Sequence, residues 1–489
     1  MEDFIKDREL LKDSAYINGE WVVSDRDTSF SVMNPATGKK LIQVADIQID
    51  QVNICIENAA EAFLSWKTKT AKERSGYLRE WYNLILQHAD DLATIMTLEQ
   101  GKPLEEAKGE VLYGASFIEW FAEEAKRTYG DIIPGFAPGR KVMTLKQPIG
   151  VVAAITPWNF PIAMITRKVG PALAAGCTII VKPSEETPLS ALALAELASR
   201  AGIPKGVFNV ITSTQAAAVG KEFCENSTVR KLSFTGSTAV GKVLMHQCAD
   251  QVKKLSLELG GNAPFIVFED ADLEAAVEGA IASKYRNAGQ TCICANRIYI
   301  QEEIYETFAE KLAAKLAGLK VGEGLRAGSE IGPLINEKAV KKVLALIEDA
   351  REKGGDIMIG GRVHAFGQSF FEPTVILNAQ ASMALAQEEV FGPVAPLFNF
   401  KDEQEVIQLA NNTKYGLAAY FYAKDVHRVW RVAEALEYGM VGINTGLIST
   451  EVAPFGGVKE SGIGREGSKY GIEEYMEIKY LCMAVEEGN

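Results

Sequence analysis

Two stretches of the chain hold residues that are suited to covalent catalysis. Cys292 lies within residues 287–297 (NAGQTCICANR), where its neighbours are small or polar, whereas a structural cysteine more often has apolar neighbours. Glu258 lies within residues 255–264 (LSLELGGNAP) among leucines, which favour a raised pKa and a general base near neutral pH. A thiol nucleophile and a carboxylate base are sufficient for acyl chemistry if the fold brings them together.

Composition and charge exclude several classes of function. The 489 residues are 47% hydrophobic and 24% charged, which is typical of a globular protein of two or three domains. No apolar run approaches the roughly 20 residues that span a bilayer. The net charge of −13 argues against nucleic acid or a membrane surface as a partner. The acidic, mixed N-terminal sequence has no secretory pattern, so we expect a cytoplasmic protein.

The cysteines and histidines indicate neither a metal site nor a hydrolase. The seven cysteines form no zinc-type paired motif, so we expect neither a structural metal nor a disulfide framework. The four histidines are scattered and none lies near a nucleophile motif. This distribution argues against a hydrolase whose nucleophile depends on histidine.

The order of elements predicts an α/β protein. Residues 15–45 indicate short strands and turns, and residues 49–129 have helical spacing of apolar side chains. Strand-like runs at 151–155, 178–181, 207–210 and 231–234 then alternate with helical segments, which is typical of a doubly wound parallel sheet. A second α/β run covers about 262–460. Residues 130–148 predict either a projecting hairpin that pairs with another subunit or an edge strand, and the tail alternates like a strand.

Ligands of such a sheet bind at the carboxyl ends of its strands, where residues 156–161, 182–185 and 235–241 follow the first, second and fourth strands. The dinucleotide fingerprint Gly-x-Gly-x-x-Gly is absent. Gly236 and Gly241 could form a turn through which a pyrophosphate approaches backbone N–H groups. The alternative is a plain helix N-cap.

Six motifs in order resemble the NAD(P)-dependent aldehyde dehydrogenase superfamily along essentially the whole chain. They are PWN at 157–159, FTGS at 234–237, LELGG at 257–261, GQTC at 289–292, EVFGP at 389–393 and PFGG at 454–457. Residues 164–168, 284–297 and 446–449 are more closely similar to the succinate-semialdehyde dehydrogenases within it.

The resemblance implies an aldehyde dehydrogenase-like α/β fold with three parts. A Rossmann-type dinucleotide-binding domain would cover residues 1–129 and 149–260. An α/β catalytic domain would cover residues 261–460. A small β oligomerisation element would cover residues 130–148 and 461–489 and would build a homotetramer, a dimer of dimers.

The resemblance also implies a catalytic sequence. Cys292 would attack the aldehyde carbon to give a thiohemiacetal, while the Asn159 amide and the Cys292 backbone N–H bind the oxyanion. Hydride transfer to the nicotinamide would leave a thioester. Glu258 would activate the water that hydrolyses it.

For the cofactor, the resemblance assigns contacts along the chain. Lys182 would hold the adenosine ribose, Gly236 and Ser237 the pyrophosphate, and Glu389 the nicotinamide ribose, with Phe391 beside the ring. Trp158 and Leu259 complete the expected cofactor contacts.

The cofactor itself is expected to be NAD. A carboxylate at Glu185 can accept hydrogen bonds from ribose hydroxyls and would repel a 2′-phosphate. Lys182 and Ser184 could still hold a phosphate, so NADP stays open.

By the same resemblance, Arg167, Arg286 and Ser449 would hold the substrate carboxylate, since bidentate arginine suits a carboxylate. In the alternative, both arginines form surface or interdomain ion pairs. The substrate would be succinate semialdehyde. Glutarate semialdehyde is the nearest alternative, because one methylene contributes only ~1–3 kcal/mol of discrimination. A binding or structural protein on the same fold, and a cysteine esterase that needs no nicotinamide, are the others.

Cys292 and Cys294 predict a redox switch. In an extended chain their Cα atoms stand close to the ~7 Å limit for a disulfide, so a modest bend would let peroxide couple the two thiols and block the nucleophile. Otherwise Cys294 is a passive neighbour. We expect peroxide to inactivate the wild type reversibly and a Cys294→Ala variant irreversibly, as measured by activity before and after a thiol reductant. Equal, reversible inactivation of both proteins would remove the hypothesis.

Overall fold

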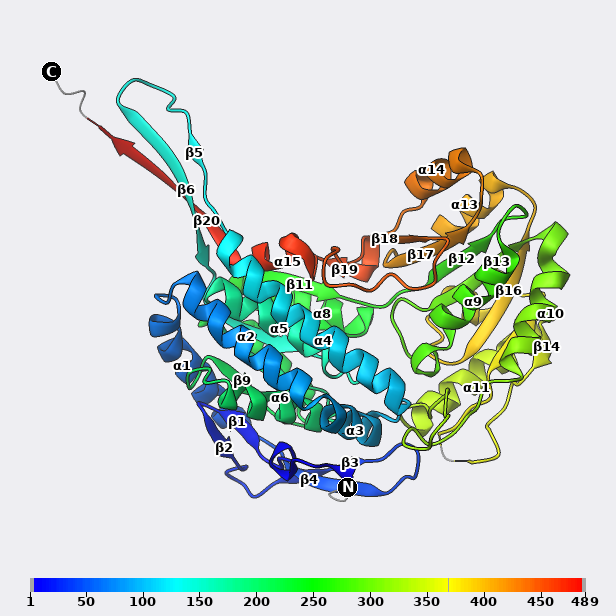
Figure 1. Ribbon diagram of the computed structural model, residues 1–489, viewed down its shortest axis with the longest axis horizontal. Helices are drawn as coiled ribbons and strands as arrows, with labels where there is room; N and C mark the ends of the chain where they lie inside the picture. Colours follow the sequence, from blue (N-terminus) through cyan, green and yellow to red (C-terminus); the bar gives the residue numbers. More distant parts are fainter. Residues whose placement is uncertain (1–3, 368, 486–489) are drawn as a thin grey trace.

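The computed structural model describes residues 4–367 and 369–485, and two large sheets organise them (Figure 1). The first sheet has eight strands in the order β19-β11-β10-β7-β8-β9-β1-β2. Its five central strands, β11 to β9, are parallel, which confirms the expected doubly wound sheet. The strands are β1 (Ala15–Ile17), β2 (Glu20–Val22), β7 (Val151–Ile155), β8 (Thr178–Lys182), β9 (Phe208–Val210), β10 (Val229–Thr235), β11 (Lys254–Glu258) and β19 (Gly462–Ile463).

Helices cover both faces of this sheet because alternate side chains of a strand point to opposite faces. Val152 and Ala154 of β7 belong to a core with α2 to α6, whereas Val151 and Ala153 belong to a core with α1, α7 and α8. The helices are α1 (Ile49–Trp66), α2 (Ala71–Gln87), α3 (Ala89–Gln100), α4 (Leu104–Glu124), α5 (Ala163–Ala175), α6 (Pro188–Arg200), α7 (Ala216–Glu225) and α8 (Thr238–Cys248).

The second sheet has seven strands in the order β14-β15-β16-β13-β12-β17-β18. All are parallel except the edge strand β14. The strands are β12 (Ala263–Val267), β13 (Ala295–Gln301), β14 (Asp356–Ile359), β15 (Thr374–Leu377), β16 (Val394–Phe400), β17 (Ala418–Tyr422) and β18 (Met440–Ile443). The accompanying helices are α9 (Leu273–Lys284), α10 (Tyr305–Leu316), α11 (Glu337–Glu352), α12 (Ala384–Gln387), α13 (Glu403–Asn411) and α14 (Val426–Ala435).

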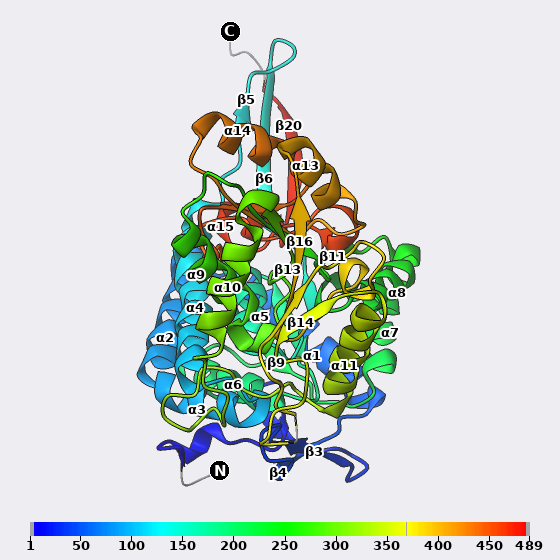
Figure 2. The ribbon, with the colours of Figure 1, turned by 90° about the vertical axis from the view of Figure 1, so that its right-hand side faces the viewer.

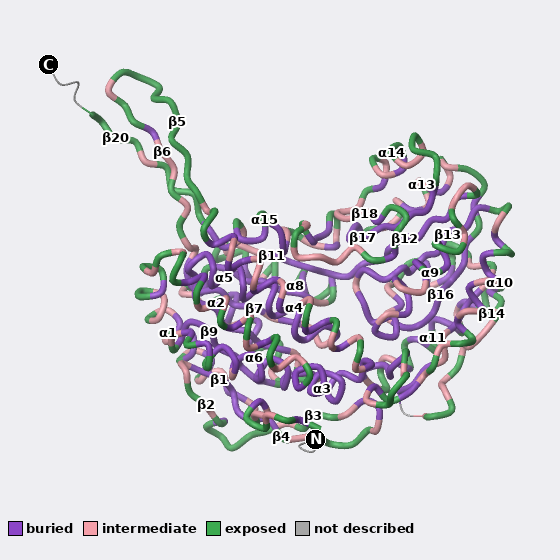
Figure 3. Tube along the Cα trace, in the orientation of Figure 1, coloured by how far each residue is buried: buried purple, intermediate pink, exposed green. Residues whose placement is uncertain are grey.

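A three-stranded antiparallel arm stands out from the body. It pairs β20 (Met476–Ala484) with β6 (Arg140–Pro148) and β6 with β5 (Ile132–Ile133). Both ribbon views place its tip beyond every other element (Figure 2), and most of it is exposed (Figure 3). Residues 130–148 therefore form a projecting hairpin. α15 (Ser468–Glu473) precedes β20, and a separate hairpin pairs β3 (Ser29–Met33) with β4 (Lys40–Ala45).

The strands of the two large sheets lie on either side of residue 260, except that β19 returns to the first sheet. The exact domain boundaries expected from the sequence stay a prediction. Among the described residues, no helix is long and apolar enough to cross a membrane.

Candidate active site

Cys292 lies on a turn between a short 3₁₀ helix (Arg286–Gly289) and β13. Asn287 and Ala288 have φ angles of 53° and 54°, and Gly289 follows with 75°. Left-handed backbone costs a non-glycine residue roughly 1–3 kcal/mol, so surrounding contacts must hold this turn. Space is also tight, because a Cβ on Gly261 would lie 2.3 Å from the Cys292 carbonyl oxygen. The nucleophile is therefore fixed by its neighbours.

Hydrogen bonds to Asn287 hold the left-handed turn. Its backbone N–H donates to Glu106 Oε2 at 2.9 Å, and its side-chain amide donates to the Asn159 carbonyl at 2.9 Å. Gln100 Nε2 donates to Asn287 Oδ1 at 2.9 Å. Three segments that lie far apart in the sequence thus meet at the residue that begins the strained turn.

Cys292 lies where two cavities meet. One cavity of about 290 Å³ contains Arg167, Arg286 and Ser449, and the other, of about 550 Å³, contains Glu258 and Glu389. Cys292 and Met164 line both. The nucleophile can therefore face an aldehyde on one side and a second reactant on the other.

The environment of Cys292 favours the protonated form of its thiol. Burial raises the pKa of the Cys292 thiol to about 12, Glu389 adds to the shift, and Arg167 opposes it. A thiol with this pKa is a poor nucleophile at neutral pH, since the thiolate is the reactive form. Attack on an aldehyde therefore requires a base or an added positive charge nearby.

Glu258 ends β11 and lines the larger cavity. Both of its carboxyl oxygens are buried without a hydrogen-bond partner among the described residues. Burial raises the pKa of Glu258 well above its ordinary value, and Glu466 adds to this, while Arg167 and Lys168 oppose it. A raised pKa makes the carboxylate a stronger base, as a general base requires.

Asn159 also lines the larger cavity beside Cys292. Its Nδ2 donates one hydrogen to the Gln290 carbonyl at 3.0 Å, and an amide nitrogen has a second hydrogen to give. The segment is held by Lys102, whose Nζ donates to the Asn159 carbonyl at 2.9 Å and pairs with Glu110. Glu110 in turn accepts from Ile162 N at 2.9 Å at the start of α5.

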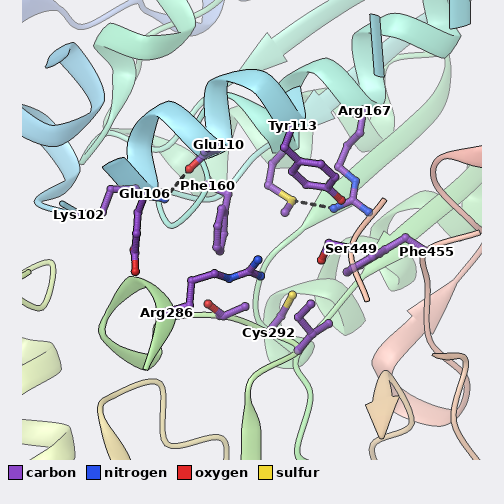
Figure 4. A pocket seen from close by; sticks show the side chains of 14 residues that line it. Lys102, Glu106, Glu110, Tyr113, Phe160, Arg167, Arg286, Cys292, Ser449 and Phe455 are labelled. Atoms are coloured by element: carbon purple, nitrogen blue, oxygen red, sulfur yellow. Dashed lines mark hydrogen bonds and ion pairs between the residues drawn. The ribbon is translucent and has the colours of Figure 1, made fainter. Parts of the chain in front are cut away.

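The smaller cavity has a cationic wall (Figure 4). Arg167 is 1% exposed, and its Nε pairs with Glu466 Oε2 at 2.6 Å, while its Nη2 has no hydrogen-bond partner among the residues that the structure describes. Arg286 lies over the Phe160 ring at 5.3 Å. Within the described part of the chain, no carboxylate forms an ion pair with Arg286. Both arginines therefore have capacity left for an anion.

The larger cavity brings together most of the expected cofactor contacts. These are Trp158, Gly236, Ser237, Leu259, Glu389 and Phe391. Burial raises the pKa of Glu389 to about 7. Ser237 is also the N-cap of α8, where its side chain accepts from Val240 N at 3.3 Å, so the cap and the cavity wall coincide. A cavity of this size suits a nucleotide-sized ligand.

Lys182, Ser184 and Glu185 do not line that cavity. Lys182 ends β8 and the other two follow it at the same sheet edge, where Thr156 N donates to the Lys182 carbonyl at 3.1 Å. Lys182 Nζ lies 3.5 Å from Glu185 Oε2. An adenosine ribose at this edge would meet both charges.

Two contacts hold the sulfur of Cys294 away from Cys292. The Cys294 sulfur lies 3.4 Å from the Gly289 carbonyl and 3.7 Å from Lys284 Nζ. Both Cys292 and Cys294 are free thiols. The redox switch therefore stays a prediction, and it requires Cys294 to leave these contacts.

Several residues around the cavities were not expected from the sequence. They are Lys102, Glu106, Glu110, Tyr113, Phe160, Lys168, Phe455 and Glu466. One signal was present: Glu106, Glu110 and Tyr113 follow helical spacing on α4, so three side chains with polar groups share one face of the helix. For Glu466, no comparable pattern in the sequence indicates that it lies at the site.

Comparison with known proteins places these features in a family context. The profile of the aldehyde dehydrogenase family matches residues 21–481. A succinate-semialdehyde dehydrogenase [NADP(+)] of Escherichia coli is 61% identical, covering 98% of this chain and all of that protein. A glutarate-semialdehyde dehydrogenase of Pseudomonas putida is 62% identical with the same coverage. The crystal structure of a succinate-semialdehyde dehydrogenase of Burkholderia pseudomallei has a TM-score of 0.98 at 61% identity, covering 98% and 100% of the two chains.

Replacing Glu258 by Gln should separate the two halves of the expected reaction. With aldehyde and NAD, we expect a stoichiometric burst of NADH and then turnover slowed by roughly 10²–10⁴-fold, because the variant lacks the base that activates water. Since the pKa of Glu258 is raised, wild-type turnover should be lost as pH falls through that raised value, and the variant should lack this limb. Stopped-flow absorbance measures both. A variant whose turnover, and whose loss of turnover at low pH, match those of the wild type would contradict the role of Glu258 as general base.

Proposed function

Because the chain belongs to the aldehyde dehydrogenase family, we propose that it oxidises succinate semialdehyde to succinate with NAD(P). One observation carries the choice of substrate: a cavity that leads to Cys292 is lined by Arg167, whose buried Nη2 has no hydrogen-bond partner among the described residues, and by Arg286, which pairs with no carboxylate among them. Arg167 and Lys168 share one carboxylate, Glu466. A buried excess of positive charge is costly unless a ligand of opposite sign fills it.

The proposed reaction assigns each step to a side chain that lines the two cavities. The Cys292 thiol first loses its proton to solvent, and Sγ then attacks the aldehyde carbon in the smaller cavity, while the free N–H of the Asn159 amide and the Cys292 N–H stabilise the oxyanion. When bound in the larger cavity, the nicotinamide supplies hydride acceptance. Glu258 then takes a proton from the water that attacks the thioester, which releases succinate and restores the thiol.

Glutarate semialdehyde is the second candidate. The relative of Pseudomonas putida that bears this name is as similar as the succinate-semialdehyde dehydrogenase. One additional methylene changes binding by only ~1–3 kcal/mol. The same cationic wall would hold the carboxylate of either substrate.

We also propose that the subunits assemble through the arm, as a dimer of dimers. Ile132 and Ile478 on the arm are 91% and 70% exposed, and apolar side chains gathered on a projecting sheet are typical of an interface. Light scattering of the purified protein tests this, and a monomeric mass would contradict it. The cytoplasmic location expected from the sequence stays a prediction.

The variant Arg286→Ala should lose activity selectively toward the anionic aldehyde. A hydrogen bond to a charged group contributes about 1.5–3 kcal/mol, so kcat/KM for succinate semialdehyde should fall roughly 10- to 100-fold. Oxidation of butanal, which has no carboxylate, should be little changed. NADH absorbance measures both rates, and the exposed Arg326→Ala is the control.

If the wild type oxidises butanal as well as it oxidises succinate semialdehyde, the proposed substrate is wrong although the dehydrogenase activity stands. A parallel loss of both activities in Arg286→Ala would instead indicate a structural role for that arginine.

The cofactor preference is a separate proposal, with NAD favoured over NADP. Glu185 is half exposed beside Lys182, and its carboxylate would repel a 2′-phosphate while accepting hydrogen bonds from ribose hydroxyls. The NADP-linked name of the relative from Escherichia coli makes this preference the point to measure.

In steady-state assays, the wild type should show a higher kcat/KM with NAD than with NADP. Glu185→Ser should raise kcat/KM for NADP by about tenfold or more, since removing one close repulsion contributes on the order of 1.4 kcal/mol. Glu225→Ser on α7, which removes the same charge elsewhere, is the control. A wild type that prefers NADP would overturn the proposal.

A further inference from the structure

Two buried groups that can donate hydrogen bonds line the smaller cavity, and neither has a partner in good hydrogen-bonding geometry among the residues that the structure describes. They are the Tyr113 hydroxyl and Arg167 Nη2. Leaving a buried donor unpaired costs about 1–3 kcal/mol, so each such group in a native protein calls for an explanation. Their presence in one cavity points to a ligand that accepts from both.

The Tyr113 ring is fixed by its packing. It lies on α4, and its ring meets that of Phe117 edge to face with centroids 5.0 Å apart. Phe117 in turn packs 5.3 Å from the Arg167 guanidinium. The hydroxyl is therefore carried on a rigid wall that also positions Arg167.

The hydroxyl points toward the anion-binding groups. In Figure 4, it lies near the guanidinium of Arg167 and on the same side of the cavity as Ser449, while Arg286 reaches in from across the cavity. Burial raises the pKa of the Tyr113 phenol, while Arg167, Arg286 and the nearby Ser449 hydroxyl oppose the shift, so the phenol remains a donor at neutral pH. A neutral donor here adds a hydrogen bond without adding charge.

We propose that Tyr113 is a specificity-determining residue whose hydroxyl donates a hydrogen bond to the terminal carboxylate of the substrate, beside Arg167 Nη2. This inference rests on the proposed function, since it assigns a further contact in the same site. A carboxylate has two oxygens with about four lone-pair positions, enough to accept from Tyr113 as well as from the arginines.

The Tyr113 hydroxyl discriminates between aldehydes with and without a terminal acceptor in a way that the charges of the two arginines alone do not. An aldehyde without a terminal acceptor leaves the Tyr113 hydroxyl unpaired in the complex, and an enzyme site rejects such a substrate because its buried polar group stays unsatisfied. The alternative is that Tyr113 has only a packing role, with its ring as an apolar surface of the cavity. In that case phenylalanine would serve equally well.

The test is the isosteric variant Tyr113→Phe, assayed with succinate semialdehyde and with butanal. We expect kcat/KM for succinate semialdehyde to fall about tenfold or more, since a hydrogen bond to a charged group is lost. kcat/KM for butanal should stay within about twofold, because the ring and its packing remain. Tyr82→Phe on α2, remote from the cavity, is the matched control.

A second measurement separates binding from folding. The inhibition constant of succinate should rise by the same factor in Tyr113→Phe, whereas that of butyramide, which has no carboxylate, should not change. Thermal unfolding midpoints confirm that the variant is folded.

Two outcomes would overturn the role of Tyr113: unchanged kcat/KM for succinate semialdehyde, or an equal loss with both aldehydes. If the wild type itself fails to prefer succinate semialdehyde over butanal, the proposed function fails first. The two failures are thus distinguished by the wild-type ratio.

Discussion

The buried ion pair between Lys102 and Glu110 is the constraint on which the geometry of the site depends. Both side chains are 1% exposed, and burying two charges is tolerated only where further hydrogen bonds satisfy them. Here those bonds go to the Asn159 carbonyl and to the N–H groups that begin α5. One pair therefore fixes the segment that carries Asn159, the proposed oxyanion donor, and the helix that carries Arg167. A well-satisfied pair of this kind specifies positions more than it adds stability.

Charge balance within the same region explains why the two cavities differ in character. Glu466 is shared by Arg167 and Lys168, and Glu258 does not offset the second cation, because burial raises its pKa and favours its neutral form. The smaller cavity is thus left with an excess of positive charge. The larger cavity is lined instead by two carboxyl groups, Glu258 and Glu389, whose pKa values burial raises. An anionic substrate would meet the complementary charge in the smaller cavity, and a cationic nicotinamide ring in the larger cavity would favour the ionised forms of these two carboxyl groups.

How far the sequence predicted this site depended on whether a residue's role is encoded locally. Cys292 was found because its neighbours are small or polar, unlike those of an ordinary core cysteine, and Glu258 because a carboxylate stands among leucines. The parallel strands were found because fully buried strands such as β8 are continuous apolar runs. Tyr113 and Glu466 were missed because their roles arise from contacts between segments far apart in the chain, Glu466 with α5 for example. The left-handed turn at Asn287 could not be predicted from the sequence either, because hydrogen bonds from distant segments hold it.

The pKa values of the reacting groups indicate how the two cavities act together. Burial raises the pKa of Cys292 to about 12 and that of Glu389 to about 7, and it also raises the pKa of Glu258. All three groups line the larger cavity, so in the empty cavity burial disfavours the ionised form of each. A positive charge placed in that cavity favours the ionised form of each group and lowers all three pKa values. The oxidised nicotinamide carries such a charge, so its binding is linked to proton release, and by reciprocity a rise in pH strengthens its binding. A site that activates its thiol only with the hydride acceptor in place protects Cys292 from reacting with aldehyde before oxidation can follow.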